Sequence, residues 1–398
     1  MTKISFSSVC AHEIKDNRST KPHILPIYAT SSFEFENLQE GIDIFTGEKQ
    51  GHVYSRYGNP TIDTVAKKMG ALENYGLGGE AQAFLCSTGM AAIHTTLLAV
   101  AKKGDKILTQ GNLYGGTTEL FNKVFSHIGV EPIFTNLQSI DSIKEALKKH
   151  PEIRLLYCET PANPTLACID LEAVGKICEE HNLTSIIDNT FATPYLQQPL
   201  KFGIDIIIHS TTKYLNGHGN SISGSIVCKN EELSKTIWNV LKLTGGTCNA
   251  FDAWLLNNGV KTLPLRMDKH CANALRIANH LETHNKVIKV NYPGLESHES
   301  YNIASKQMSQ YGGMMSIEVD GGIEAGKTVM NNLKFCTLAP TLGDIDTLIL
   351  HPASMSHLKV PKEMRERNGI TDGLIRISVG IEDVADIIMD IEQALEKV

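Results

Sequence analysis

Lys213 lies in a segment whose residue types suit covalent chemistry. It follows the apolar run 206–208, and the hydroxyl side chains beside it belong to Ser210, Thr211 and Thr212. An amine at the mouth of an apolar sheet can form a Schiff base with a carbonyl, and neighbouring hydroxyls can hold a phosphate. A lysine after a strand is more often a solvated loop charge, so this segment needs support from elsewhere in the chain.

Asp188 ends a second short apolar run, which begins at Thr184. A carboxylate at the end of a strand can keep a pyridine nitrogen protonated, which lets the ring withdraw electrons from a substrate carbanion. The alternative at such a position is an aspartate that caps a helix or closes a turn.

A third segment predicts a strand, a turn and a helix in succession. The run 81–86 is followed by Ser87, Thr88 and Gly89, and then by the alanine-rich stretch 90–100. The free N–H groups and positive dipole end of such a helix suit a phosphate, and glycine permits close approach. An ordinary helix cap by Ser87 or Thr88 is the alternative. Taken together, the phosphate turn, the carboxylate and the lysine predict a site for pyridoxal 5'-phosphate (PLP).

The chain resembles the Cys/Met-metabolism family of PLP-dependent enzymes from about residue 26 to its C-terminus. The resemblance implies an α/β fold of type I, like that of aspartate aminotransferase, with a mainly parallel sheet between helices and a smaller α+β C-terminal domain. It rests on ordered motifs at residues 54–60 (YSRYGNP), 159–164 (ETPANP), 188–190 (DNT), 210–213 (STTK), 351–354 (HPAS) and 374–380 (LIRISVG).

The resemblance also implies roles for the matching residues. Lys213 would form the Schiff base and move protons, Asp188 would pair with the pyridine nitrogen, and Tyr114 would stack on the ring and protonate the leaving group. The implied cofactor-binding residues are Gly89, Met90, Asn163, Ser210 and Thr212, with Tyr54 and Arg56 supplied by a neighbouring subunit.

Arg376 would bind the substrate carboxylate as a bidentate fork, a geometry that lysine cannot reproduce, with Thr341 beside it. Sharing of Tyr54 and Arg56 between subunits implies a dimer at least, and a homotetramer is expected.

The implied reaction is γ-elimination on a sulfur amino acid. The motifs resemble methionine γ-lyases most, which convert L-methionine to methanethiol, 2-oxobutyrate and ammonia. Many of those enzymes carry cysteine where this chain has Gly116 and lysine where it has Leu241. O-acetylhomoserine sulfhydrylase, which replaces the γ-substituent with sulfide or a thiol, and cystathionine γ-lyase are therefore alternatives.

Residues 321–328 (GGIEAGKT) match the P-loop pattern and indicate a different class, a nucleotide-binding protein. Three features oppose that interpretation. Glu324 would put negative charge in the phosphate cradle, residues 314–319 alternate like a half-buried strand, and little chain follows. We expect Lys327 to be a solvated helix residue.

Composition limits the remaining function classes. The chain has 398 residues and a formal net charge of −7 without a basic block, which argues against nucleic acid as a partner. No apolar stretch approaches the roughly 20 residues needed to cross a bilayer, and the first residues are not a secretory signal, so a cytoplasmic enzyme is expected. Nine cysteines without a C-x-x-C pair favour reduced thiols, and 15 histidines without ligand spacing favour no metal.

The pattern of apolar segments predicts three parts. Residues 1–60 form an extended arm with one short helix that reaches a neighbouring subunit. Residues 61–250 alternate helices and strands and form the PLP-binding domain. Residues 251–398 form the C-terminal domain, which starts with a long helix broken at Pro264.

Overall fold

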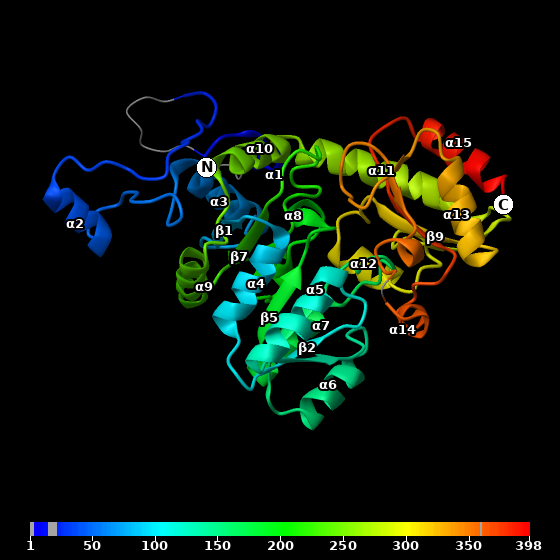
Figure 1. Cartoon of the computed structure of the whole chain (residues 1–398), viewed down its shortest axis with the longest axis horizontal. Coiled ribbons are helices and arrows are strands. Elements are labelled where there is room, and N and C mark those ends of the chain that lie inside the picture. The colour runs from blue at the N-terminus through cyan, green and yellow to red at the C-terminus, as the bar shows by residue number, and fades with distance from the viewer. Residues whose placement is uncertain (1–3, 15–21, 359) are drawn as a thin grey trace.

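Two β-sheets organise the computed structural model, which describes residues 4–14, 22–358 and 360–398. The larger sheet has the order β1-β7-β6-β5-β4-β2-β3 (Figure 1). Strands β1 and β6 pair antiparallel with β7, and the other pairs are parallel. Its strands are β1 (Gln82–Cys86), β2 (Lys106–Thr109), β3 (Glu131–Phe134), β4 (Ile153–Glu159), β5 (Thr184–Asp188), β6 (Ile206–His209) and β7 (Gly224–Cys228).

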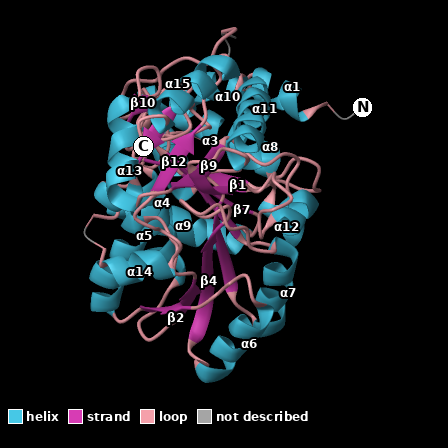
Figure 2. Ribbon diagram, turned by 90° about the vertical axis from the view of Figure 1, so that its right-hand side faces the viewer, coloured by secondary structure: helices cyan, strands magenta, loops and turns pink. Residues whose placement is uncertain are grey.

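Helices cover both faces of this sheet, as Figure 2 shows, because its central strands are apolar on both sides. In β6, Ile206 and Ile208 pack with helices α4 and α9, whereas Ile207 packs with α3 and α10 on the opposite face. The helices of this part are α3 (Pro60–Glu73), α4 (Gly89–Val100), α5 (Gly115–Leu120), α6 (Ile140–Lys149), α7 (Leu171–His181), α8 (Thr193–Leu196), α9 (Glu231–Thr244) and α10 (Ala250–Lys261). The predicted mainly parallel sheet between helices is confirmed.

The smaller sheet has the order β10-β11-β12-β9-β8 and carries helices α11, α13 and α15 on one face. Its strands are β8 (Val287–Asn291), β9 (Met314–Val319), β10 (Thr337–Leu338), β11 (Leu348–Leu350) and β12 (Leu374–Ser378). The helices are α11 (Leu263–Glu282), α12 (Tyr301–Gln307), α13 (Gly322–Asn332), α14 (Lys362–Arg367) and α15 (Val384–Leu395). Short π or 3-10 turns are η1 (Phe121–Phe125), η2 (Ser126–Ile128), η3 (Pro199–Phe202) and η4 (Pro352–Ser354).

The predicted half-buried character of residues 314–319 is wrong. Every residue of β9 except Glu318 is buried. One face packs against helices, and on the other the Ser316 hydroxyl donates to the Pro164 carbonyl of the larger domain at 3.0 Å. The expected helix break is present, with α10 ending at Lys261 and Pro264 in the first turn of α11, where its missing N–H is not needed.

The P-loop interpretation fails on the same region of the chain. Its residues from Gly322 onward belong to helix α13, so they form no loop around a phosphate. Lys327 is half exposed and pairs with Glu324 at 2.7 Å, as expected of a solvated helix residue.

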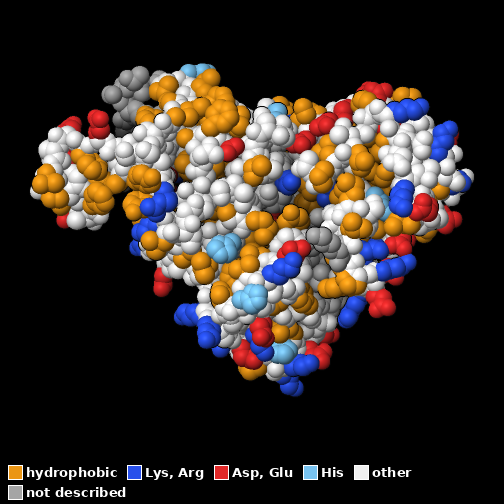
Figure 3. Space-filling view, in the orientation of Figure 1, with side chains coloured by type: hydrophobic (Ala, Val, Ile, Leu, Met, Phe, Trp, Pro, Cys, Tyr) orange, Lys and Arg blue, Asp and Glu red, His pale blue; other side chains and the backbone are white. Residues whose placement is uncertain are grey.

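The part of the N-terminal arm around residues 38–46 stands away from the body of the molecule, at the left of Figure 1, whereas Cys10 is fully buried in the core. It carries helix α2 (Leu38–Thr46), and helix α1 (Phe6–Ala11) precedes it, so the arm region has two short helices instead of one. Residues 1–3 and 15–21 of the predicted arm lie outside the described residues. Apolar side chains gather on the arm in Figure 3, where Leu38 and Phe45 are 82% and 66% exposed.

Two kinds of feature are absent from the described ranges. No helix within them is long and apolar enough to cross a membrane. Nor does any group of three or more histidine, cysteine or acidic side chains in this part of the chain have the arrangement of a metal site.

Candidate active site

The carboxyl ends of three neighbouring parallel strands place ionisable side chains at one edge of the larger sheet. Strand β4 ends at Glu159, β5 at Asp188 and β6 at His209, and Glu159 is in register with Asp188. Ligands of open α/β sheets bind beyond such strand ends. The turn 210–213 follows β6 directly, so it brings the lysine to the same edge.

Lys213 is joined to the C-terminal domain through Thr341. Its Nζ donates to the Thr341 hydroxyl at 3.0 Å, and the Thr341 carbonyl accepts from Nη2 of Arg376 at 2.8 Å. Gly343 makes this approach possible, because a Cβ there would lie 2.6 Å from the Tyr214 nitrogen. The structure therefore brings together three predicted site residues from distant parts of the sequence.

The two cations of this group sit in a poorly solvated environment. Burial, and then the charge of Arg376, lowers the pKa of Lys213, which increases its fraction of nucleophilic free amine. Burial lowers the pKa of Arg376 to about 10, so the guanidinium stays charged at neutral pH. Its Nε is buried without a hydrogen-bond partner, so this N–H is available to donate to a substrate carboxylate.

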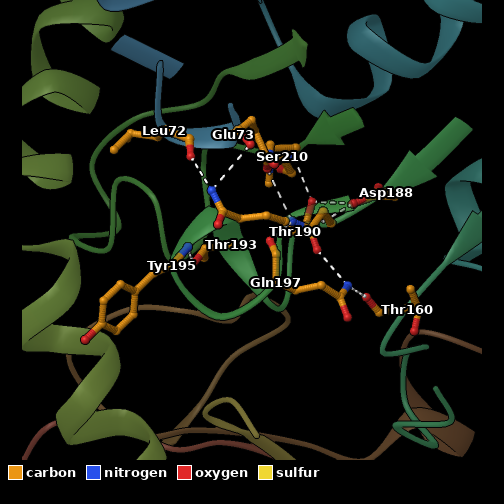
Figure 4. A network of polar contacts seen from close by, with 12 residues as sticks. Leu72, Glu73, Thr160, Asp188, Thr190, Thr193, Tyr195, Gln197 and Ser210 are labelled. Carbon is orange, nitrogen blue, oxygen red and sulfur yellow. Dashed lines mark hydrogen bonds and ion pairs between the residues drawn. The ribbon is translucent and has the colours of Figure 1, made fainter. Parts of the chain in front are cut away.

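Asp188 is held by Thr190, two residues farther along the chain. The Thr190 hydroxyl donates to Oδ1 of Asp188 and accepts from the Ser210 N–H at 2.8 Å (Figure 4). The pKa of Asp188 is raised on balance, because burial outweighs the hydrogen bonds from Thr190 and the charge of His209, which lower it. The Thr190 hydroxyl and the Thr190 backbone N–H both donate to Oδ1 of Asp188, which leaves Oδ2 for a cationic partner such as a pyridinium nitrogen.

Gly89 and Ser210 lie against each other at the start of helix α4. A Cβ at Gly89 would come within 2.8 Å of the Ser210 Cβ, so only glycine fits. Thr88 caps the helix by accepting from the Ala91 N–H at 2.8 Å, which is the alternative role considered for it. The first helical N–H groups, including that of Met90, have no acceptor within the helix and suit an anion.

Thr212 follows in the same turn as Ser210. Its hydroxyl accepts from the Ser223 N–H at 3.0 Å and lies within reach of the Ser223 carbonyl at 3.2 Å. The backbone of Ser223, which directly precedes β7, thus holds the Thr212 hydroxyl in place on the turn that also carries Lys213.

Tyr114 caps helix α5, and its ring is 51% exposed. Its backbone N–H donates to Oε2 of Glu159 at 2.8 Å. Burial, and then the charge of Asp188, raises the pKa of Glu159, while this hydrogen bond lowers it. Asn163, which comes from the loop after β4, has a buried Oδ1 without a partner and so faces a polar position that a ligand can fill.

Within one chain, Tyr54 and Arg56 lie beside each other, with the guanidinium carbon of Arg56 5.6 Å from the centre of the Tyr54 ring. Arg56 donates through Nη1 to the Lys242 carbonyl and lies 4.8 Å from the centre of the Tyr57 ring. None of the hydrogen bonds or ion pairs of the described residues joins it to Ser210 or Lys213.

A cavity of about 880 Å³ lies next to the site and opens between the two domains. It is lined in part by Gln110 and Asn112 from the loop before Tyr114, and by Lys289, Glu318 and Arg367 from the C-terminal domain. Because Lys213, Asp188 and Arg376 do not line it, we do not take it as the reaction site.

Two positioning residues, Glu159 and Thr190, had no predicted role although both lie in recognised motifs. A charged residue that ends an apolar strand and a hydroxyl two residues after an aspartate are the signals that could have indicated them.

Comparisons with known proteins decide the family. The profile of the Cys/Met metabolism PLP-dependent enzyme family matches residues 7–396. The chain belongs to this family. The L-methionine gamma-lyase of Fusobacterium nucleatum is 49% identical over 376 residues, 94% of this chain and 93% of that protein. The cystathionine beta-lyase of Lactococcus lactis is 42% identical, covering 96% and 97%.

The fold agrees with this membership. The crystal structure of cystathionine gamma-lyase from Lactobacillus plantarum, complexed with L-serine, aligns with a TM-score of 0.92 and 36% identity over 99% of both chains. The expected type I fold is confirmed, and the protein is a PLP-dependent enzyme. The residues present fit the cofactor, since the two hydrogen bonds from Thr190 leave Oδ2 of Asp188 for the ring nitrogen, and the close contact of Gly89 with Ser210 brings the start of α4 beside the turn that carries Lys213.

Proposed function

We propose that this family member catalyses γ-elimination on L-methionine, consuming water and giving methanethiol, 2-oxobutyrate and ammonia. The observation that carries the proposal is the pairing of Arg376 with Leu350 on adjacent strands, where both face away from the helices that cover the sheet. A cation that binds a carboxylate thus stands beside a buried apolar side chain, which suits an uncharged thioether. The similarity to the F. nucleatum enzyme supports the same substrate.

The roles of the chain's residues follow from their positions. Bound PLP supplies an electron-withdrawing ring that stabilises negative charge on the substrate. Asp188 would keep the ring nitrogen protonated, and Lys213 would hold the cofactor through its aldehyde and carry protons between substrate carbons. Arg376 orients the substrate through its carboxylate. Tyr114 covers the ring and protonates the departing thiolate.

Gly89, Met90, Ser210 and Thr212, at the start of α4 and in the turn after β6, would hold the cofactor phosphate. Asn163 donates to the ring oxygen, and Thr341 positions the substrate carboxylate. Tyr54 and Arg56 complete the phosphate site from a neighbouring subunit, and within one chain Arg56 donates to the Lys242 carbonyl instead.

This sharing makes the protein an active-site-sharing dimer, and we propose that two dimers form a cytoplasmic homotetramer. The proposed division is an arm at 1–60, a PLP-binding domain at 61–250 and a C-terminal domain at 251–398.

The test is to incubate the purified, PLP-loaded protein with L-methionine alone and to follow methanethiol and 2-oxobutyrate. Release of both in equal amounts is expected. No release, together with consumption of O-acetylhomoserine and sulfide, would establish the γ-replacement alternative, which the glycine at position 116 favours. Turnover of cystathionine alone would identify a cystathionine lyase.

A further inference from the structure

A buried ion pair that the proposed chemistry does not use lies behind Asp188. Glu73 ends helix α3 and His209 ends strand β6, and both side chains are fully buried. Nε2 of His209 and Oε1 of Glu73 are 2.6 Å apart. Asn189, the neighbour of Asp188, also donates to this oxygen, at 3.3 Å.

Attachment of helix α3 to the sheet does not by itself explain why this pair is buried. Burying two ionisable groups carries a desolvation cost that apolar residues of similar volume avoid. The pair is also incompletely hydrogen-bonded, since Oε2 of Glu73 and Nδ1 of His209 are buried without partners. Its charges therefore need another explanation.

The pair is placed to act on Asp188. His209 directly precedes Ser210, whose N–H is bound by the same Thr190 hydroxyl that holds the Asp188 carboxyl. Figure 4 shows Glu73, Ser210, Thr190 and Asp188 in one network. Burial is the largest influence on Asp188 and raises its pKa on balance, and the charge of His209 limits this rise.

We propose that Glu73 and His209 are positioning residues that hold a positive charge behind Asp188, keeping it ionised toward the cofactor. The Glu73 carboxylate holds the His209 ring in place at 2.6 Å, and the charge of His209 offsets that of Asp188. Glu159, in register with Asp188 on β4, is the opposing influence, because a second carboxylate there disfavours ionisation. An ionised Asp188 carboxylate would bind the protonated cofactor ring more tightly than a neutral one.

The decisive experiment compares PLP dissociation constants of apoprotein variants by equilibrium dialysis. Glu73→Gln keeps the size and the acceptor for His209 but removes the charge, and the dissociation constant should rise about tenfold, equivalent to one pKa unit. In an Asp188→Asn background the same change should have no further effect, because the group through which it acts is gone.

Gln198→Leu is the matched control. Gln198 Nε2 donates to the carbonyls of Leu72 and Tyr75 at 2.9 and 3.1 Å, so this change loosens the same end of α3 without altering charge. It should lower the melting temperature and leave the PLP dissociation constant unchanged.

Two results would overturn the proposal. One is a PLP dissociation constant for Glu73→Gln within about twofold of the wild-type value at an unchanged melting temperature. The other is an equal rise with and without the Asp188 carboxylate. Because no amino-acid substrate is present, failure to cleave methionine leaves this test intact, and the proposal rests only on the PLP site.

Discussion

At the residue scale, Arg376 is the group whose environment best defines its task. It is 4% exposed, its Nη2 is held by the Thr341 carbonyl, and its Nε is unpaired. A buried cation with a free fork position is suited to a carboxylate, because the ligand supplies both the missing hydrogen bond and the missing charge.

Replacing Arg376 with alanine should lower kcat/KM for the amino-acid substrate. The loss of transition-state stabilisation should be roughly 2 to 4 kcal/mol, as expected when one partner of a buried charge pair is removed. Arg376→Lys should recover only part of this loss, since an ammonium cannot form the bidentate contact. Steady-state kinetics give the values, and PLP content is the control. Reduced PLP content in either variant would show that Arg376 supports the cofactor instead.

Gly116 stands where many methionine γ-lyases carry cysteine, and its surroundings leave little space for a side chain. A Cβ there would lie 2.6 Å from Cε1 of Tyr114 and 3.1 Å from the sulfur of Met90. Gly116→Cys should therefore displace the half-exposed Tyr114 ring and change kcat several-fold, with little effect on the melting temperature. Gly115→Ala, where a Cβ meets nothing within 4 Å, is the control. Equal kinetics for the two variants would show that the Tyr114 ring yields freely.

At the element scale, a carboxylate joins helix α15 to the segment before β10. Asp390 accepts from the backbone N–H groups of Lys334, Phe335 and Cys336 at 2.8, 2.9 and 2.8 Å. Burial opposes ionisation of this carboxyl, but the three N–H donors outweigh it, so the pKa of Asp390 is lowered. Apolar packing alone would leave those N–H groups unpaired.

Asp390→Asn should reduce the free energy of unfolding at pH 7 by roughly 1.5 to 3 kcal/mol, the value of hydrogen bonds to a charged group. Because the folded pKa is below the unfolded value of about 3.9, the stabilisation is complete above that pH and disappears as pH falls through the folded pKa. Denaturant unfolding of wild type and variant should therefore converge at low pH. Asp386→Asn, on the exposed side of α15, should have a small effect at every pH.

At the scale of the whole molecule, the arm is the feature that a single chain does not explain. It leaves Leu38 and Phe45 exposed, and Arg56, which follows α2, donates to the Lys242 carbonyl. Exposed apolar surface on a protruding segment is expected to be covered by another subunit.

Co-expression of Lys213→Ala and Arg56→Ala chains tests this sharing. Each variant alone should have little activity, whereas mixed dimers contain one site with both residues, so random pairing should restore about a quarter of the sites. Activity per bound PLP in the mixture, measured against each variant alone, gives the answer. Activity equal to the average of the two homo-oligomers would show that Arg56 acts within its own chain.

Much of the architecture was available from local sequence. Residues 184–188 form a strand as expected, because a short apolar run that ends in a turn residue fits a sheet buried on both faces. Burial of β9 was not available, since the surface that covers its second face comes from the loop at Pro164, which is distant in sequence.

The sequence by itself determined the chemistry: a lysine, an aspartate and a glycine turn at successive strand ends, in an order that identifies the family. Only the tertiary structure decided which groups meet. Thr341 bonds Lys213 across 128 positions, and Glu73 pairs with His209 across 136. Local patterns report how a residue suits its own strand or helix, whereas such contacts depend on how two separate elements pack, which no local pattern encodes.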